Sequence, residues 1–289
     1  WNRLPVIGAV CALIGAVACA ILGAANPKQF FFSWLVSFLF FLSLGLGALF
    51  FVLIQFAVQG GWGIVLRRIG ETTFATLPVM AALFLPVYLG LHDLYSWSVP
   101  GAAEHDALLR WKAPYLNVPF FLMRAALYFG LWSFIALLYY RGSRGQDVTG
   151  DPGVSARLRR FAGPAIIVLA LTQTFASVDW IMSLTPHWYS TMFGVYFFAG
   201  SFVGFIALLS VVAAAMRQAG LLDTVISAEH LHDVGKLLFG FTVFWAYIAF
   251  SQFFLMWYAN LPEETTWYQA RMEGSWLTVS LFLMAGHFA

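Results

Sequence analysis

The chain has 289 residues, of which 61% are hydrophobic, 18% aromatic and only 10% charged. Because a soluble domain carries roughly 25% charged residues, this composition excludes an ordinary water-soluble fold. The formal net charge of +2 gives no indication of a nucleic-acid partner, so we expect none. The sequence predicts an all-α, polytopic helical membrane protein.

Apolar stretches that are long enough to cross a bilayer follow one another along the chain. A spanning helix needs about 20 predominantly apolar residues, and by this criterion we expect eight spans in this chain. The chain starts at Trp1 and stops within an apolar run, so we expect it to be part of a longer protein with the last span truncated. The expected spans are 5–25, 30–58, 72–91, 118–140, 161–184, 189–216, 237–258 and 276–289.

The loops on the two sides of these spans differ in positive charge. Ten Lys and Arg residues fall on the side of the N-terminus and four on the other side. Because basic residues mark cytoplasmic loops, we expect a cytoplasmic N-terminus and a cytoplasmic 141–160 segment, which its Gly and Arg content predicts to be a flexible linker. The ten are Arg3, Arg67, Arg68, Arg141, Arg144, Arg157, Arg159, Arg160, Arg217 and Lys236, and the four are Lys28, Arg110, Lys112 and Arg271.

Two loops on the outer side, 92–117 and 259–275, combine acidic and aromatic residues. Trp and Tyr collect at membrane interfaces in general, and they are also favoured anchors in protein interfaces. The composition fits an interfacial belt alone or a belt that also docks a partner. On the second interpretation a periplasmic partner covers Trp97, Trp111, Trp267 and Tyr268.

Polar side chains inside the spans form a layer at one depth. At about 1.5 Å per residue, Asp179 lies ~7 to 8 Å from the outer end of its span, Arg124 and Gln252 ~9 Å, and Ser37 ~10 Å. A charged residue within a span costs roughly 2.5 to 3.5 kcal/mol, so we expect Arg124 to be the counter-ion of Asp179. Such a pair either fixes helix packing alone or handles protons beside a small-molecule pocket, and the sequence leaves both interpretations open.

Further polar residues stand near the outer ends of the spans. His92 and Asp93 close the third span, and His187 follows the fifth. Asp179, Ser183 and His187 are spaced i, i+4, i+8, which predicts one shared helical face if Pro186 does not bend the helix. The same spacing relates Arg124, Tyr128 and Trp132 on the fourth span.

The inner side carries a smaller group of ionisable residues. Glu71 enters the third span, and the stretch HLHDVGK with His232, Asp233 and Lys236 enters the seventh. An acidic residue at a helix N-terminus is stabilised by the helix dipole, so Glu71 and Asp233 are either capping residues or the mouth of a proton path.

The sequence lacks the ligands of a resident redox group. A membrane haem b needs axial ligands on facing helices, yet His287 alone among the six histidines lies inside an apolar run. The two cysteines do not form an iron–sulfur motif. We therefore expect no haem, iron–sulfur cluster or other metal on this chain.

Several stretches together are typical of one family. They are LHDLYSW (91–97), VPFFLMRAALYFGLW (118–132), SVDWIMSLTPHWYSTMFG (177–194) and the long 231–268 segment. They resemble the polysulfide-reductase-like (NrfD-like) membrane subunits, most closely the second such subunit of alternative complex III. The resemblance implies ten helices in the full protein and two four-helix bundles, which divides this chain into a first helix with a short loop (1–29), a first bundle (30–184) and a truncated second bundle (185–289).

The resemblance also implies a function. It implies a non-haem, multi-pass subunit of a quinol:electron-acceptor oxidoreductase in the bacterial inner membrane, not catalytic alone, with menaquinone or ubiquinone as the quinone. The implied partners are a sister NrfD-like membrane subunit, a periplasmic iron–sulfur protein, multihaem cytochromes c and lipids. The alternatives are a proton-coupled secondary transporter and a purely structural membrane anchor. On the leading interpretation the quinone- or proton-handling residues are Asp179, Arg124, His92, Asp93, His187, Ser37 and Gln252, and the inner proton path includes Glu71, His232, Asp233 and Lys236.

Overall fold

The computed structural model describes residues 3–61, 63–221 and 225–288, and the regular structure in these ranges is helical throughout. Seven of the described helical segments are long and apolar enough to cross a membrane. The expected all-α polytopic fold is therefore confirmed. These segments are Leu4–Ala25, Pro27–Val58, Ile64–Leu89, Val118–Thr149, Pro152–Leu184, Phe193–Gln218 and Ala228–Ala259.

Most of the spans are long single helices whose polar ends extend beyond the apolar runs. A bilayer contains no water to satisfy backbone groups, so each apolar run closes its hydrogen bonds within a helix. Side chains then set the boundaries: Asn26 accepts from the Gln29 N–H at the start of the second span, and Gln59 ends that helix in the left-handed conformation. The long helices are α1 (Leu4–Ala25), α2 (Pro27–Val58), α9 (Val118–Thr149), α10 (Pro152–Trp180), α11 (Phe193–Gln218) and α12 (Ala228–Ala259).

The third span differs because it is divided into short helices. It begins at Ile64, earlier than the expected 72, and Pro78 and Pro86 stand in the first turns of its second and third pieces. Proline lacks an N–H donor and disfavours helical backbone in the residue before it, which accounts for the breaks before α4 and α5. The pieces are α3 (Ile64–Phe74), α4 (Leu77–Leu83), α5 (Leu85–Leu89) and α6 (Leu91–Leu94).

The expected eighth span is a shorter helix in the described residues. α14 (Ser275–Gly286) has 12 residues, none of them buried, and packs against α13 (Pro262–Met272). It is apolar, as predicted, but below the about 20 residues that a crossing requires. The remaining short elements are η1 (Ser96–Ser98), α7 (Ala102–His105), α8 (Ala107–Lys112) and η2 (Met182–Leu184).

The segment 141–160 is not the flexible linker that its composition predicts. α9 continues to Thr149 and α10 starts at Pro152, so only two residues form the turn of a helical hairpin. Gly150 takes the left-handed conformation at φ 66°, and the Asp151 carboxylate caps α10 by accepting from the Gly153 N–H at 2.8 Å.

Contacts between the two hairpin helices explain why the glycines of this segment do not unwind it. The Tyr139 hydroxyl donates to the Leu158 carbonyl at 2.7 Å, and the Ser155 hydroxyl donates to Gln146 at 2.9 Å. Leu158 is buried against the surface that Gly142 leaves free. Such tertiary contacts outweigh the roughly 1 kcal/mol that each helical glycine costs.

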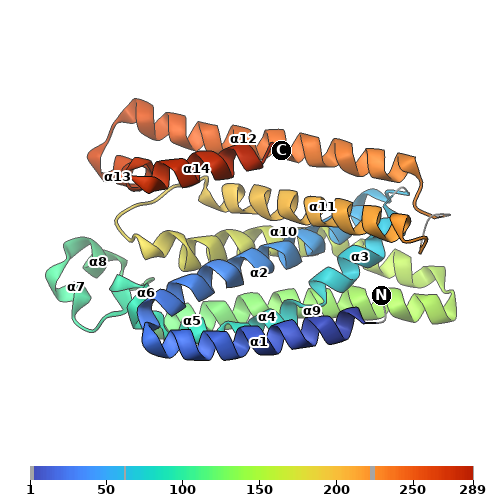
Figure 1. Cartoon of the computed structure of the whole chain (residues 1–289), viewed down its shortest axis with the longest axis horizontal. Coiled ribbons are helices and arrows are strands. Elements are labelled where there is room, and N and C mark those ends of the chain that lie inside the picture. The colour runs from blue at the N-terminus through green and yellow to red at the C-terminus, as the bar shows by residue number, and fades with distance from the viewer. Residues whose placement is uncertain (1–2, 62, 222–224, 289) are drawn as a thin grey trace.

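α2 is the central helix of the molecule, with α3, α10 and α11 packed around it. The approach of α11 is closest at Gly47, where a Cβ atom would lie 2.3 Å from the Ser201 carbonyl oxygen. α1 lies along α2 without a buried residue, and α12 forms the opposite edge of the molecule (Figure 1). The main buried cluster includes residues from Leu35 to Val234, and two smaller clusters lie around Trp188 and Trp245. The division into 1–29, 30–184 and 185–289 stays a prediction.

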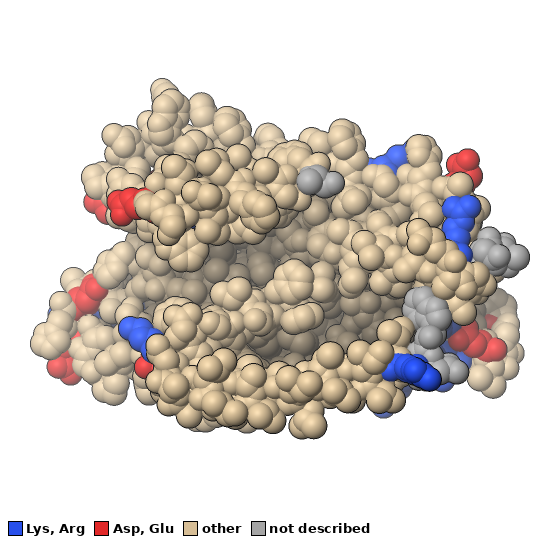
Figure 2. Space-filling view, viewed as in Figure 1, with Lys and Arg blue, Asp and Glu red and all other residues tan. Residues whose placement is uncertain are grey.

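The helices run along the long axis, so their ends gather at two opposite ends of the molecule (Figure 1). We call the end with α6, α7, α8 and α13 the α8 end, and the end with the 149–152 turn the hairpin end. Figure 2 shows Lys, Arg, Asp and Glu at these two ends and, on this face, a hollowed middle without charged residues between them. This distribution is the one expected for a chain that spans a bilayer.

Candidate functional site

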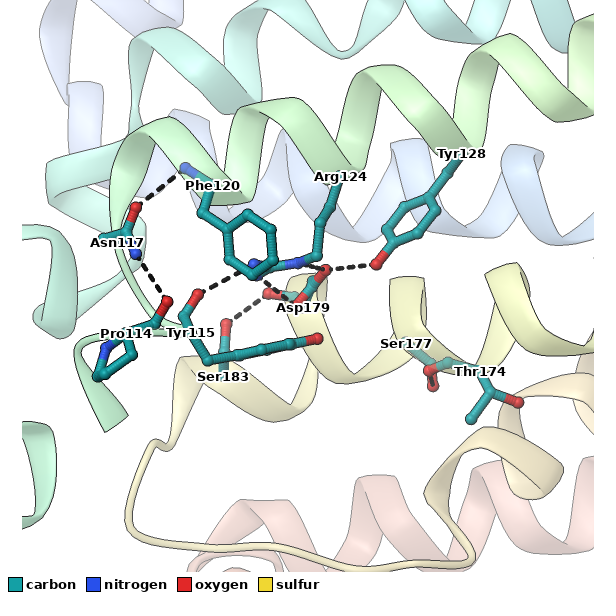
Figure 3. Close-up of polar contacts among 10 residues, drawn as sticks. All are labelled: Pro114, Tyr115, Asn117, Phe120, Arg124, Tyr128, Thr174, Ser177, Asp179 and Ser183. Carbon is teal, nitrogen blue, oxygen red and sulfur yellow. Dashed lines mark hydrogen bonds and ion pairs between the residues drawn. The ribbon is translucent and has the colours of Figure 1, made fainter. Parts of the chain in front are cut away.

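The Arg124–Asp179 ion pair lies buried between α9 and α10 near the α8 end (Figure 3). Asp179 is 0% exposed, and Arg124 is 6% exposed. Nε of Arg124 donates to Oδ2 of Asp179 and Nη2 donates to Oδ1, both at 2.8 Å. The pairing expected from depth alone is therefore confirmed, and its geometry is bidentate, the strong form of such a pair.

Other groups complete the surroundings of this pair. The Tyr128 hydroxyl donates to Oδ2 of Asp179 at 2.8 Å, as its position one turn after Arg124 allows. Nη1 of Arg124 donates to the Tyr115 carbonyl at 3.0 Å, and the guanidinium carbon lies 3.9 Å from the Tyr115 ring centre and 4.3 Å from that of Phe120. Both charges are thus fully engaged by protein groups.

The ends of the two helices position the pair. Asn117 caps α9 by accepting from the Phe120 N–H at 3.0 Å, which fixes the helix start before Arg124. α10 ends at Trp180, whose carbonyl accepts from the Tyr95 hydroxyl at 2.9 Å. The Ser183 hydroxyl donates to the carbonyl of Asp179. These bonds satisfy carbonyl groups that a helix end otherwise leaves without a partner.

A cavity of about 650 Å³ lies beside the pair at the α8 end. Tyr115 and Ser183 line it and also contact the pair, so they connect the cavity with the buried charges. Lys112 closes one side by donating from Nζ to the Pro186 carbonyl at 2.6 Å. Burial lowers the pKa of Lys112. The apolar part of the lining comes from Leu108, Trp111, Leu116, Met182 and Trp188.

His187 lines this cavity but not in the predicted way. Because α10 ends at Trp180, the expected helical face shared with Asp179 does not extend to His187. Nε2 of His187 instead lies 2.7 Å from Oδ2 of Asp106. The backbone N–H of Leu109, a second one from Leu108 and His187 itself together hold the pKa of Asp106 below its usual value.

The rest of the predicted outer layer is not gathered at this site. Ser37 is exposed on α2, donates to the Ser33 carbonyl at 3.0 Å and lines a different cavity of about 660 Å³. His92 and Asp93 are exposed on α6. Gln252 is buried in α12, where its amide donates to the Tyr268 hydroxyl at 3.3 Å. Equal depth did not imply contact: α2 does approach α10 at this level, where the Phe38 and Trp180 ring centres lie 6.2 Å apart, but Ser37 is on the exposed face of α2.

The aromatic residues expected to face a partner have different surroundings. Trp97 is 7% exposed within this chain, packed on the rings of Tyr95 and Phe121, so the expectation that a partner covers it is wrong. Trp267 stacks on Trp188 with ring centres 4.1 Å apart, and Tyr268 is half-buried. Trp111, at 78%, is the exposed member of the four.

At the hairpin end, Glu71 lies in the interior of α3 and not at its start. It is 0% exposed, and its oxygens lie 3.1 Å from Nε of Arg67 and 2.8 Å from Nη1 of Arg68. Arg68 also pairs with Asp147 of α9. The capping interpretation of Glu71 is therefore wrong: Glu71 pairs with two arginines of its own helix, and Arg68 joins this group to α9 of the hairpin.

Capping does not explain Asp233 either. The N-cap of α12 is Ser227, which exchanges hydrogen bonds with His230. Asp233 stands in the second turn and pairs with Lys236 at 3.1 Å, while His232 is exposed. Across the described residues no hydrogen bond or ion pair joins His232, Asp233 or Lys236 to Glu71. The structure therefore does not connect the residues of the predicted inner proton path.

Two residues of the cavity region escaped the sequence analysis. Tyr115 lies in a loop, where the sequence gives no spacing that relates it to Arg124, and its ring contacts Arg124 only in the folded chain. Asp106 could have been found, because an Asp directly before the run ALL is a helix N-cap signal, and it does cap α8.

Comparisons with known proteins add no identification. No family model matches the chain, and a search of curated proteins finds no match. Within the described residues no group of three or more His, Cys, Asp and Glu side chains could hold a metal ion. The fold defines a multi-pass helical membrane protein, and the resemblance to the NrfD-like subunits stays a prediction.

Proposed function

We propose that the chain is an NrfD-like membrane subunit of a quinol-oxidising complex in the bacterial inner membrane, and that the cavity at the α8 end receives the quinol headgroup. The observation that carries the proposal is the composition of that one cavity. Its lining combines an apolar wall with His187, Lys112 and Tyr115, beside the buried Arg124–Asp179 pair. Apolar cavities with a few convergent polar groups are the usual form of small-molecule sites.

The chemistry of the lining suits a quinol. Oxidation of a quinol to a quinone releases two protons and two electrons, so the site needs proton acceptors. His187 is the first acceptor in this proposal, because its imidazole lines the cavity and its Nε2 lies 2.7 Å from Oδ2 of Asp106. Asp179 lies behind Tyr115 and Ser183, which line the cavity, and its carboxylate accepts from the Tyr128 hydroxyl at 2.8 Å.

The electrons must leave to other subunits, since we expect no redox metal on this chain. The proposed acceptors are a periplasmic iron–sulfur protein and multihaem cytochromes c, next to a sister NrfD-like subunit, with menaquinone or ubiquinone as substrate. The exposed Trp111 at the mouth of the cavity suits an anchor for such a partner.

The transporter alternative has less support. Transporters built from inverted repeats interrupt a matching pair of helices near the bilayer midplane. In the part of the chain that the structure describes, the third span alone is divided into several short helices. A purely structural anchor would not require a cavity-lining histidine that is paired with a carboxylate, as His187 is with Asp106.

The test uses the complex that contains this chain, purified through a tag on it. A photoreactive quinone should label peptides 106–116 and 182–189, and quinol should compete with the label. His187→Gln should lower quinol oxidation at least tenfold, which is about 1.4 kcal/mol of barrier. His105→Gln is the matched control, because His105 is exposed on α7 outside the cavity. Labelling elsewhere, equal turnover of the two variants, or a complex without redox partners would contradict the proposal.

A further inference from the structure

We propose that the groove between α9 and α10 at the hairpin end binds one anionic phospholipid, with its phosphate between Arg141 and Arg157 and an acyl chain along Phe134 and Phe161. This site is separate from the cavity at the α8 end. It does not depend on the function proposed above, because it rests on a different part of the molecule.

The groove has a volume of about 750 Å³ and runs between the two hairpin helices. Gly142 brings its floor together, since a Cβ atom there would lie 3.2 Å from the Leu158 side chain. Gly145 keeps it open toward the surface, since a Cβ atom there would meet nothing within 4 Å. Phe134, Leu138 and Phe161 form the apolar walls. The site therefore exists only because residues 141–160 are helical.

Two cations face this groove without a compensating charge. Arg141 on α9 and Arg157 on α10 are both exposed, and neither has a hydrogen bond or an ion pair to any described residue. The one acidic residue in the lining is Asp151, whose carboxylate accepts from the Gly153 N–H at 2.8 Å as the cap of α10. The groove thus presents a net positive charge to its occupant.

The order of the lining along the bilayer normal matches a phospholipid. Phe134 lies seven residues, or about 10 Å, from Arg141 toward the middle of the span, and Phe161 lies about 6 Å from Arg157 in the same direction because the helices are antiparallel. The cations are therefore at headgroup level and the aromatic rings in the hydrocarbon layer. Basic clefts between membrane helices are known to bind anionic headgroups.

A helix from another subunit or from a second copy would suit this groove less well. A tight helix–helix contact would remove two unpaired guanidinium groups from water, and uncompensated burial of charge is strongly unfavourable. A phosphate supplies the missing negative charge between the two side chains. An anionic lipid is therefore the occupant that the charges favour.

The experiment uses the purified chain in lipid nanodiscs with phosphatidylglycerol that carries a photoreactive group on one acyl chain. We expect crosslinks in peptides covering 134–161, and a loss of about tenfold in the double variant Arg141→Gln/Arg157→Gln. The matched control is Arg144→Gln/Arg160→Gln, which removes two exposed charges from the same helices outside the groove. The control should retain its labelling within about twofold.

Each of the following outcomes would contradict the proposed lipid site. Equal labelling by the matching phosphatidylcholine probe would show ordinary boundary lipid, and an equal loss in the control would show diffuse surface charge. Competition by millimolar inorganic phosphate would show a site for a free anion, and a crosslink to a polypeptide would show a protein occupant. If the double variant does not fold, Arg141→Lys/Arg157→Lys retains both charges, and loss of labelling in that folded variant would equally count against charge recognition.

Discussion

Asp179 and Arg124 show at the scale of single residues what a charge inside a membrane protein requires. Removal of either charge from water costs several kcal/mol. The bidentate ion pair offsets this cost only if all donors and acceptors are engaged. Here the carboxylate receives three hydrogen bonds, two from Arg124 and one from Tyr128. The pair is thus stabilised by local geometry whether or not it also moves protons.

A double-mutant cycle on this pair is the first prediction. We expect Arg124→Gln to lower the free energy of unfolding by about 3 to 5 kcal/mol, the usual cost of one uncompensated buried charge. Asp179→Asn should cost less, because Arg124 keeps the Tyr115 carbonyl and two aromatic rings. The double variant should be less destabilised than the sum, with a coupling of about 1 kcal/mol or more. Unfolding of the purified chain in detergent measures all four states.

The same set of unfolding measurements can include a control variant and can test the alternative that Arg124 and Asp179 act independently. Asp93→Asn changes an exposed carboxylate and should stay within about 0.5 kcal/mol of the parent. Additive losses in the cycle would show that the two side chains do not act as a unit. Quinol turnover of a stable double variant then separates the two roles: normal turnover indicates packing alone, and lost turnover indicates proton handling.

Sequence reasoning succeeded for this pair and failed for its neighbours, for physical reasons. Two opposite charges at one depth in apolar helices have few ways to be satisfied, so Arg124 and Asp179 could be paired in advance. Ser37 and Gln252 are uncharged, and nothing forces them toward a common site. His187 was misplaced because a hydrogen bond from Ser183 and a turn at Ile181, neither of which is evident in the sequence, end α10 first.

At the scale of elements, apolar runs predict that a helix exists but not where it ends. The expected fourth span stops at 140, whereas α9 continues to Thr149. The added turns are polar and glycine-rich, and their contacts to α10 stabilise them. Two interruptions of the third span follow from Pro78 and Pro86, which were visible in the sequence. The third, at Gly90 before α6, is not at a proline.

The hairpin turn provides the second prediction. Gly150→Ala should destabilise the chain by roughly 1 to 2 kcal/mol, because Gly150 has φ 66° and an L-residue in the left-handed region pays about that amount. Gly145→Ala should be neutral or stabilising by up to about 1 kcal/mol, because it lies inside α9 with free space around its Cβ position. Thermal unfolding in detergent measures the difference, and equal effects would indicate that 141–160 is a flexible linker after all.

At the scale of the whole molecule, the distribution of charge was predictable and the packing order was not. Alternating spans place basic residues at two ends, and the structure has its charged ends there (Figure 2). The central position of α2 depends on small residues such as Gly47, which lets the backbone of α11 come close. The sequence of a single apolar helix does not show which other helix will pack against such a residue. The exposed apolar surfaces of α1 and α14 leave room for lipid or for further helices.

The orientation of the chain in the membrane is the last prediction. The hairpin end carries the larger group of Lys and Arg residues, and basic residues are retained on the cytoplasmic side. With Cys11 and Cys19 replaced by Ser, a cysteine at Val148, which is 87% exposed, should resist a membrane-impermeant maleimide in spheroplasts and react after permeabilisation. A cysteine at the exposed Thr266 near the α8 end should react at once. The reverse pattern would place the N-terminus outside, and equal reaction at both sites in intact spheroplasts would contradict a fixed transmembrane orientation.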